Sequence, residues 1–385
     1  MDWKTMNRPF HWFAEYYQII NGNGGFDVII GNPPYVEYNK KDKKTGIAIS
    51  DLYKLKGYKT LNCGNLYAFC VERSINQLLR NNGTIGMIVP ISISSTDGYD
   101  SLRSVLSQGL LGGYISNFGV RPAKLFDGVD KRLSIFISSK ENSWYTTKYR
   151  RWNEIERCII FQTVKYVKAS FNSFEIPGLC KISTLIERKI LEKIFHFLSL
   201  SRDMKNKTPY KLQYTRKLQY FIQFFIETPI IYDKNDNVIE PSELKHIYFD
   251  NEIDRDIAIS ALNSSLFFWF FITFADCRNV NAREIKSFPL SLTSVDLSIG
   301  KLLVILSNKI LKNLKDNSVF LPRNDKKAGL LKIQSFQPRL SKPIIDEIDK
   351  VLAKHYGFTD EELDFIINYD IKYRMGDELN ANNEE

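Results

Sequence analysis

The sequence has few cysteines and histidines among its 385 residues, and neither type is spaced for a disulfide framework or a metal centre. The five cysteines show no CxxC spacing, and the four histidines do not cluster beside them. We therefore expect reduced thiols and no bound metal.

Long apolar runs are also missing. The longest, residues 266–274, is too short to cross a bilayer, and the N-terminus lacks the apolar core of a signal peptide. We expect a soluble, cytoplasmic protein without a membrane partner.

Acidic residues are outnumbered by basic ones. There are 53 Lys and Arg against 44 Asp and Glu, which gives a formal net charge of +9. A basic surface suits a polyanionic partner, although a modest excess of charge also serves solubility. Hydrophobic residues make up 44% of the chain, which is enough to bury a core in each of two domains.

Apolar runs in the first part of the chain predict alternating strands and helices. Residues 27–30 are apolar after the first and show no alternation, which is typical of a central parallel strand covered on both faces. Residues 65–80 carry apolar side chains at spacings of three and four and end at Asn-Asn-Gly, which predicts a helix. Residues 84–90 predict a second buried strand, and residues 114–119 and 132–139 predict an antiparallel pair that closes the sheet.

The expected fold class is α/β. We expect a partial Rossmann-like sheet within residues 1–150, followed by an α+β domain at residues 170–376 and a polar tail at residues 377–385. Two helices are well signalled near the end of the chain. One has a proline in its first turn and stops at Gly357, and the next opens with a Thr359 to Glu362 capping box.

The segment FDVIIGNPPY, residues 26–35, ends a strand in four residues with distinctive chemistry. Pro33 and Pro34 remove two N–H donors and leave backbone carbonyls as acceptors. Asn32 adds a side-chain carbonyl, so a planar amino group could donate one hydrogen to Asn32 and one to the Pro33 carbonyl. Tyr35 offers a flat face for a heterocycle, worth roughly 1–3 kcal/mol per stacked base. Adenine extruded from a duplex fits this description, although a simple proline-rich turn has the same letters.

At these residues the sequence resembles a known family. FDVIIGNPPYVEY resembles motif IV of the amino-group DNA methyltransferases that act on adenine N6. Residues 64–95 resemble the helix and strand that follow this motif in the large type IIG restriction-modification methylases and their phage-defence relatives. Residues 121–137 resemble the loop between the closing strands, and residues 261–289 and 361–376 resemble the target-recognition region.

The resemblance implies roles for particular residues. Asn32, Pro33, Pro34 and Tyr35 match the catalytic set, and Phe126 matches the aromatic residue that contacts the flipped base. The implied methyl donor is S-adenosylmethionine, with direct in-line transfer. Residues 1–150 would then be the C-terminal half of a methyltransferase catalytic domain, and residues 170–376 a DNA target-recognition domain.

The family's donor-binding strands have no counterpart in the sequence as we interpret it. In the family, a glycine-rich turn follows the first strand, whereas the glycine-rich residues 21–25 precede one. Only about 25 residues come before Phe26, and a single βαβ unit takes roughly 30. We therefore expect an unpaired apolar strand edge, completed by a separate N-terminal methyltransferase or nuclease-methylase chain. A truncated remnant of a broken gene is the alternative.

Three basic segments are candidates for contact with double-stranded DNA. Residues 40–59 contain seven lysines against two aspartates, residues 201–221 interleave basic residues with tyrosines, and residues 276–289 carry side chains suited to purine edges. The candidate residues are Lys40, Lys41, Lys43, Lys44, Arg216, Lys217, Arg278, Asn281 and Arg283. Each segment has a structural alternative: a solvated loop, an ordinary charged surface, or a helix start that Asn281 caps.

Three functions remain open at this point. The first is a site-specific adenine-N6 DNA methyltransferase that is split or truncated. The second is a DNA-recognition subunit without activity of its own. The third is a protein-glutamine methyltransferase, because an amide nitrogen poses the same chemical problem, but the long basic second domain argues against it.

Overall fold

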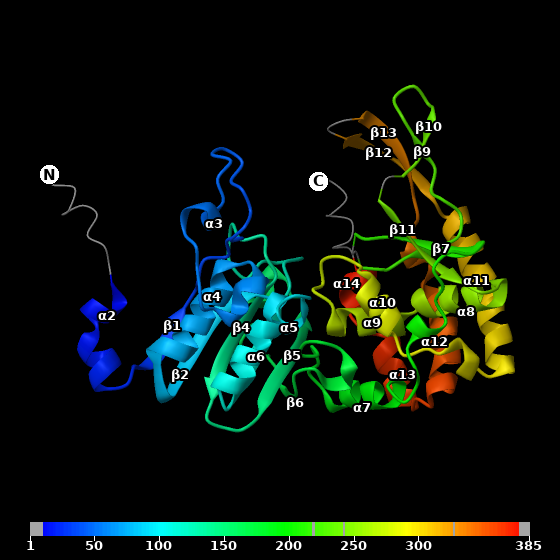
Figure 1. Ribbon diagram of the computed structural model, residues 1–385. Coiled ribbons are helices and arrows are strands. Elements are labelled where there is room, and N and C mark those ends of the chain that lie inside the picture. Colours follow the sequence, from blue (N-terminus) through cyan, green and yellow to red (C-terminus); the bar gives the residue numbers. More distant parts are fainter. Residues whose placement is uncertain (1–10, 218–219, 242, 326–327, 377–385) are drawn as a thin grey trace. The chain divides into compact units, whose positions relative to one another are not determined.

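The computed structural model describes residues 11–217, 220–241, 243–325 and 328–376. The chain forms two compact units, residues 1–183 and residues 184–385 (Figure 1). The first unit thus extends beyond residue 150, where we expected the catalytic portion to end, and the second starts later than residue 170. The predicted polar tail lies outside the described residues.

The first unit is built on a mixed sheet of six strands among the described residues, in the order β1-β2-β4-β3-β5-β6. The strands are β1 (Phe26–Gly31), β2 (Leu79–Pro90), β3 (Gly112–Phe118), β4 (Leu133–Ser139), β5 (Trp144–Arg150) and β6 (Val167–Ala169). β1 runs parallel to β2, and β3 pairs antiparallel with β4. The predicted α/β character and the antiparallel closing pair are confirmed.

Helices α4 (Leu66–Arg73) and α6 (Asp100–Gly109) lie on one face of this sheet (Figure 1). α4 begins where the side-chain oxygen of Asn65 accepts the amide of Tyr67 at 3.4 Å. We predicted one helix up to residue 80, but a π-helical turn follows at Ser74–Leu78 and β2 starts at Leu79. The chain turns early because pairing with β1 already begins at Leu79, opposite Phe26.

Gly25 allows the two parallel strands to approach each other at their starts. Its φ is +125°, and a Cβ at this position would lie 2.5 Å from the carbonyl oxygen of Leu78. The glycine-rich residues 21–25 therefore sit at the amino end of β1, at the opposite end of the strand from Asn32.

β1 forms an edge of the sheet in the part of the chain that the structure describes. Val28 is 57% exposed and Ile30 is 84% exposed. The prediction of a strand covered on both faces is therefore wrong, because the face of β1 that carries these two side chains is exposed. The expected apolar, unpaired edge is confirmed.

A buried polar network joins the turn after β2 to the middle of the sheet. The amide oxygen of Asn117 accepts hydrogen bonds from Ser94 at 2.8 Å and from Ser134 at 2.9 Å. Its amide nitrogen donates to the Thr147 carbonyl at 3.0 Å. Because both ends of this fully buried amide are satisfied, the network fixes the position of the residues that follow β2.

The second unit is α+β, as predicted. One antiparallel sheet has the order β11-β7-β8 and the other the order β10-β9-β13-β12. The strands are β7 (Tyr210–Thr215), β8 (Phe224–Phe225), β9 (Ile231–Tyr232), β10 (Val238–Ile239), β11 (Leu244–Phe249), β12 (Val319–Asp325) and β13 (Gly329–Ser335). The helices are α7 (Leu185–Ile194), α8 (Glu252–Leu262), α9 (Ser265–Phe274), α10 (Ala282–Ser287), α11 (Leu297–Asp316), α12 (Lys342–Tyr356), α13 (Asp360–Ile367) and α14 (Ile371–Met375).

Both predicted signals near the end of the chain are confirmed. α12 ends at Gly357, whose φ is +66°. α13 opens with the capping box, in which the Glu362 carboxylate accepts the Thr359 amide at 2.8 Å.

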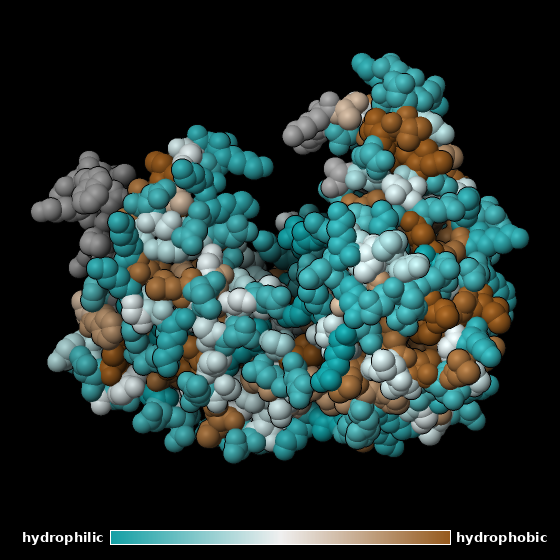
Figure 2. Space-filling view, turned by 45° about the vertical axis from the view of Figure 1, so that its right-hand side comes forward, coloured by the Kyte–Doolittle hydropathy of each residue, from teal (hydrophilic) through white to brown (hydrophobic). Residues whose placement is uncertain are grey.

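The four-stranded sheet projects from the helices of this unit as an arm. Figure 2 shows apolar side chains on this arm, where Val319 and Phe320 are each more than 40% exposed.

The aromatic run at residues 266–274 forms α9, and every residue of this helix is buried. It is therefore core. In the described residues no single helix is long and apolar enough to span a membrane. Only α8 and α9 taken together pass that test, and a bend of 70° separates them.

The start of α9 is capped by a buried carboxylate from α12. Asp349 accepts the amides of Ser265 at 3.2 Å and Leu266 at 3.1 Å. Burial raises the pKa of Asp349 to about 6, although these hydrogen bonds and the nearby cations Arg374 and Lys342 act in the opposite direction.

We predict that Asp349 makes the stability of the second unit depend on pH. The folded protein binds the Asp349 proton more tightly than the unfolded chain, whose Asp pKa is about 3.9, so the free energy of unfolding falls as pH rises from about 4 through 6. The full effect is about 3 kcal/mol. Chemical denaturation of the native protein and Asp349→Asn across this range measures it.

The Asp349→Asn variant lacks the titrating group and is expected to give a flatter curve. Asp360→Asn, an exposed residue at the start of α13, is the matched control and keeps the native pH dependence. If native protein and Asp349→Asn changed in parallel with pH, the burial of Asp349 would not determine the slope.

Candidate site at the carboxyl end of strand β1

Asn32, Pro33, Pro34 and Tyr35 directly follow β1, where the chain leaves the sheet beside the end of β2. In the parallel register, Gly31 lies opposite Met87. The hydroxyl of Tyr35 donates to the carbonyl of Ile88 at 2.8 Å. The motif is therefore tied to the carboxyl ends of two parallel strands, the end of an open α/β sheet where ligands bind.

The Tyr35 hydroxyl makes a second contact, with Asn32. The side-chain oxygen of Asn32 accepts from the same hydroxyl at 2.5 Å. A phenol carries one proton, so Tyr35 donates to only one of these two oxygens at a time. Asn32 is exposed, and its side-chain oxygen has a second lone pair that can accept a hydrogen bond from a ligand.

Burial raises the pKa of Tyr35 to about 12. The phenol therefore keeps its proton at neutral pH and acts as a donor, not as a base. Pro33 is half-buried, while Asn32 and Pro34 are exposed. The strand end thus exposes the side-chain amide of Asn32 next to the half-buried ring of Tyr35.

Tyr67 and Tyr99 continue the aromatic contacts of Tyr35 into the first unit. Tyr35 meets Tyr67 edge to face, with ring centroids 6.4 Å apart, and Tyr67 stacks on Tyr99 at 5.7 Å. The hydroxyl of Tyr67 shares a 2.6 Å hydrogen bond with Ser92, and Tyr67 is fully buried. Neither tyrosine was predicted. The available signal was the position of Tyr67 in the first turn of the predicted helix.

The loop between β3 and β4 brings Phe126 to the same end of the sheet. Phe126 is 40% exposed, while its neighbour Leu125 is buried. Leu125 belongs to a hydrophobic cluster with Phe118 and Trp152, and both Tyr35 and Val129 pack against that cluster. The structure therefore brings together the predicted catalytic residue Tyr35 and the loop that carries the predicted base contact.

Arg157 binds the backbone of this loop. Its guanidinium donates to the carbonyls of Lys124 at 2.9 Å and Leu125 at 3.2 Å. It lies over the ring of Trp152, 4.9 Å from the centroid, and pairs with the carboxylate of Glu154. Sequence analysis missed this residue, because only the fold brings it to a loop more than 30 positions earlier.

The lysines of residues 40–59 are all exposed. Lys40 forms an ion pair with Glu37 at 3.3 Å, whereas Lys41, Lys43 and Lys44 extend around a turn that Asp42 closes. Hydrogen bonds from the Thr45 and Lys44 amides lower the pKa of Asp42. The predicted lysine cluster is thus displayed on an ordered loop.

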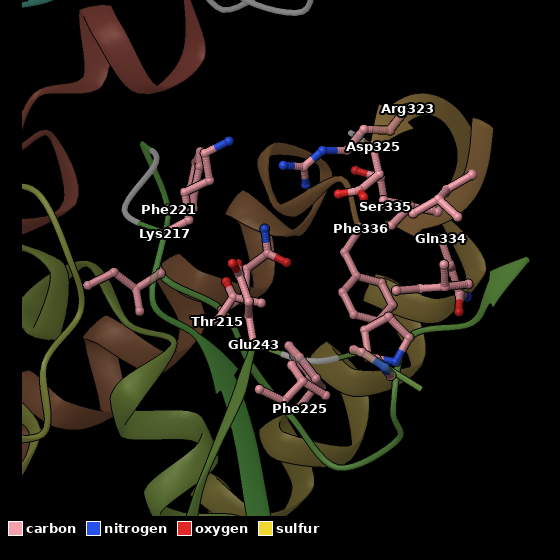
Figure 3. A pocket seen from close by; sticks show the side chains of 18 residues that line it. Thr215, Lys217, Phe221, Phe225, Glu243, Arg323, Asp325, Gln334, Ser335 and Phe336 are labelled. Atoms are coloured by element: carbon pink, nitrogen blue, oxygen red, sulfur yellow. The ribbon is translucent and has the colours of Figure 1, made fainter. Parts of the chain in front are cut away.

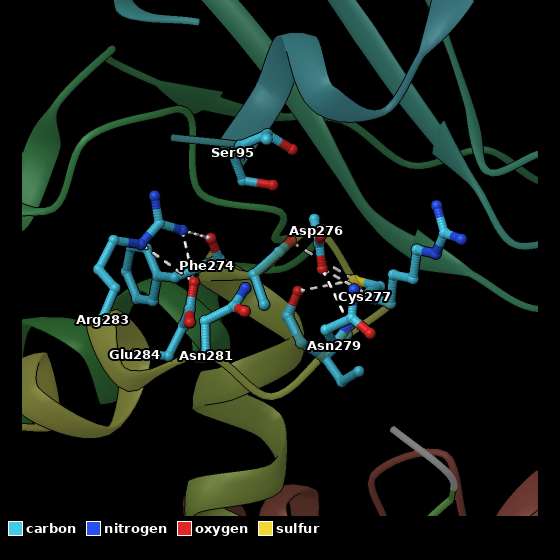
Figure 4. Close-up of polar contacts among 12 residues, drawn as sticks. Ser95, Phe274, Asp276, Cys277, Asn279, Asn281, Arg283 and Glu284 are labelled. Carbon is cyan, nitrogen blue, oxygen red and sulfur yellow. Dashed lines mark hydrogen bonds and ion pairs between the residues drawn. The ribbon is translucent and has the colours of Figure 1, made fainter. Parts of the chain in front are cut away.

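In the second unit the structure brings together Arg216, Lys217 and Asn281, which come from two separate segments (Figure 4 shows Asn281 among its neighbours). Arg216 donates to the side-chain oxygen of Asn281 at 3.2 Å, and Lys217 forms an isolated β-bridge with Asn279. Asn281 precedes α10 but makes no capping hydrogen bond with its side chain. The alternative in which Asn281 caps this helix is wrong.

Arg278 and Arg283 differ in their surroundings. The side chain of Arg278 is exposed, and its amide donates to Asp276. Arg283 donates to the Phe274 carbonyl at 2.9 Å and pairs with buried Glu284, whose pKa is raised by burial (Figure 4). The guanidinium of Arg283 is thus occupied inside the unit, where it fixes the turn between α9 and α10.

The second unit also contains a cavity of about 370 Å³ (Figure 3). Its wall includes the aromatic residues Phe221, Phe225 and Phe336, and charges of both signs. Lys217 lines it, but the predicted catalytic motif lies in the other unit. Within the described ranges, no group of three or more His, Cys, Asp or Glu is arranged to hold a metal ion.

The fold and this strand end define an α/β protein that exposes an asparagine amide at the carboxyl end of a parallel strand. Residues 2–117 match the family model of the Eco57I restriction-modification methylase, and this segment contains β1, the Asn-Pro-Pro-Tyr motif and β2. The family resemblance is thereby confirmed as a partial match: these residues are similar to the Eco57I restriction-modification methylase.

Individual relatives match shorter or more distant parts. The type II restriction enzyme and methyltransferase RM.Eco57I of Escherichia coli is 27% identical over 189 residues, covering 48% of this chain and 18% of that protein. The type II methyltransferase M.TthHB8I of Thermus thermophilus is 37% identical over 89 residues, covering 22% of this chain and 20% of that protein. The chain thus covers no more than a fifth of either relative.

Among solved structures, the type IIG restriction endonuclease BpuSI is 10% identical, with a TM-score of 0.29. The similarity covers 89% of this chain and 54% of that chain. At this TM-score the likeness carries no structural argument, so the roles considered below rest on the family match and on the chain's own geometry.

We predict that Arg157 determines the order of the Phe126 loop. Arg157→Ala removes two donors to the loop backbone and the cation over Trp152, so the amides of residues 119–132 should exchange hydrogen several-fold faster. Arg157→Lys cannot bond both carbonyls as a planar fork and should fall between. Hydrogen exchange followed by mass spectrometry measures this, with Lys168→Ala on β6 as the control. Unchanged exchange in Arg157→Ala would contradict the prediction.

Proposed function

We propose that the chain serves a site-specific DNA methyltransferase, in which a methyl group passes from S-adenosylmethionine to the N6 atom of a flipped adenine. The observation that carries the proposal is the exposed side chain of Asn32 at the end of β1, whose oxygen contacts the Tyr35 hydroxyl and keeps a second lone pair for a ligand. The match of residues 2–117 to a methylase family supports the same chemistry.

The amino group of the adenine donates one hydrogen to the Asn32 oxygen and one to the Pro33 carbonyl. This arrangement holds the nitrogen so that its lone pair can point toward an electrophilic methyl group. Tyr35 and Phe126 hold the base by stacking and contact, and each stacked aromatic contributes roughly 1–3 kcal/mol. No side chain has to act as a nucleophile, and Tyr35 remains protonated throughout.

The described residues do not fit the donor itself. The family places a glycine-rich turn at the carboxyl end of a strand, whereas Gly24 and Gly25 lie at the amino end of β1. S-adenosylmethionine would supply the methyl group. The donor site lies on a protein segment that pairs with β1.

The exposed edge of β1 supports such a partner. Val28 and Ile30 place apolar side chains in solvent beside the unpaired side of the strand. A separate N-terminal methyltransferase or nuclease-methylase chain adds a parallel strand there and completes the sheet. The second unit contacts double-stranded DNA through Arg216, Lys217, Arg278 and Asn281, and the lysines of residues 40–59 contact phosphates. Arg283 supports this surface from inside.

A DNA-recognition subunit without activity of its own is the second candidate. The observation that favours it is the same unpaired edge of β1, since a chain that never meets a donor-binding partner would bind DNA and transfer nothing. Methyl transfer therefore distinguishes the two functions.

We predict that methylation depends on Asn32. Labelled methyl incorporation from S-adenosylmethionine into unmethylated DNA is measured with the purified chain, alone and with its genomic neighbour. Asn32→Ala removes one of the two acceptors and should lower the rate by about 100-fold or more. Asn39→Ala, an exposed asparagine in the adjacent loop, should keep the native rate. Equal rates in both variants would contradict the role of Asn32. DNA binding without any methylation would favour the recognition subunit.

We also predict that the partner binds along β1. Ile30→Lys places a charge on the unpaired edge, which opposes strand addition without removing a buried contact. Stimulation of methylation by the partner should fall, while DNA binding by the chain alone stays unchanged. Ile155→Lys, at a position that is 86% exposed and outside the sheet, is the control. Full stimulation of Ile30→Lys would place the partner elsewhere.

A further inference from the structure

Backbone hydrogen bonds join the two ends of residues 36–65, which we call the lysine loop. It leaves and returns through a bridge between Glu37 and Asn65, and the amide of Tyr38 donates to the Gly64 carbonyl at 2.8 Å. The carboxylate of buried Glu72 accepts the amides of Lys59 and Thr60, both at 2.9 Å. The loop therefore keeps a defined path between the motif and α4.

One buried side chain fixes the middle of the loop. The hydroxyl of Tyr38 donates to the carbonyl of Tyr53 at 2.5 Å and accepts the amide of Leu55 at 2.9 Å. Its ring meets Phe69 of α4 edge to face at 5.4 Å. The backbone on both sides of residue 54 is thus pinned to the body of the first unit.

The side chains beside this anchor point outward. Leu52, the last residue of α3 (Ile49–Leu52), is 65% exposed, and Tyr53, whose carbonyl Tyr38 holds, is 67% exposed. Displaying two large apolar side chains in water is unfavourable. A fixed backbone that exposes them indicates a contact surface.

The charge on the loop favours one kind of partner. The loop carries seven exposed lysines, and both of its aspartates are engaged in its own turns, Asp42 with Thr45 and Asp51 with Ala48. Lysine is depleted at protein–protein interfaces, so two exposed apolar side chains on a lysine-rich loop fit such an interface poorly. They suit duplex DNA, which has phosphates outside and an apolar base stack inside.

We propose that Leu52 and Tyr53 form a wedge that enters the base stack of duplex DNA next to the extruded nucleotide, while the lysines bind the flanking phosphates. This inference rests on the proposed function and extends it. A stacked aromatic side chain offsets part of the cost of opening a base step. Tyr38 is the positioning residue, because it fixes the backbone of Tyr53 without reaching the surface.

The test uses a 30-base-pair duplex and the same duplex with one abasic site, which offers an open stack and needs no knowledge of the recognition sequence. Equilibrium binding of the full chain is measured by fluorescence anisotropy. The native protein should bind the abasic duplex roughly tenfold more tightly. Tyr53→Ala and Leu52→Ala should lose most of this preference but keep their affinity for the intact duplex. Tyr38→Phe should lose part of it.

Two kinds of control separate the wedge from the charge. Lys43→Ala with Lys44→Ala should weaken binding to both duplexes equally and reduce the salt dependence, because phosphates are present in each. Ile155→Ala removes an equally exposed apolar side chain outside the loop and should change neither affinity.

The outcomes distinguish the wedge from the proposed function. If Tyr53→Ala kept the full abasic preference, or lost affinity for both duplexes equally, the wedge would be wrong while the DNA-binding role of the lysines stood. If the native protein bound neither duplex, both the wedge and the proposed function would fail.

Discussion

The hydrogen bond from the Tyr35 hydroxyl to the Ile88 carbonyl holds the candidate site together. It ties the end of β1 to the end of β2, and the same hydroxyl contacts the side-chain oxygen of Asn32. The ring of Tyr35 meets Tyr67 of α4 and packs against the cluster that contains Leu125. One side chain thus links the acceptors, a helix and the Phe126 loop, so the geometry of the site depends on the packed sheet and not on a flexible turn.

Much of the first unit could be predicted because its strands are apolar and contiguous in sequence. The closing pair at residues 112–118 and 133–139 was predicted within two residues. The end of α4 was not, because the early start of β2 depends on its pairing with Phe26, which lies far away in sequence. Burial of β1 was wrong for a related reason: an apolar run indicates that a strand should be covered, but it does not say which molecule provides the cover.

The residues of the candidate site were also predictable only in part. Asn-Pro-Pro-Tyr could be recognised because its chemistry lies in four consecutive residues. Arg157 and Tyr99 could not, because topology alone brings an ordinary surface arginine under a loop and a loop tyrosine behind a helix. Asn281 shows the limit most clearly. The local sequence left open a helix cap or a contact with a purine edge, but the side-chain partner of Asn281 is Arg216, 65 positions away on a different segment.

The first unit exposes two surfaces that differ in chemistry and fit different partners. The edge of β1 is apolar and carries unpaired backbone groups, so it suits another protein strand, whereas the lysine loop suits nucleic acid. A strand added parallel to β1 would end at the same side of the sheet as Asn32, because parallel strands share their carboxyl ends. The partner would then bring its ligand to Asn32 along the open edge, and DNA would reach the same residue past the loop that follows the motif. Two substrates can therefore meet at one strand end without competing for one surface.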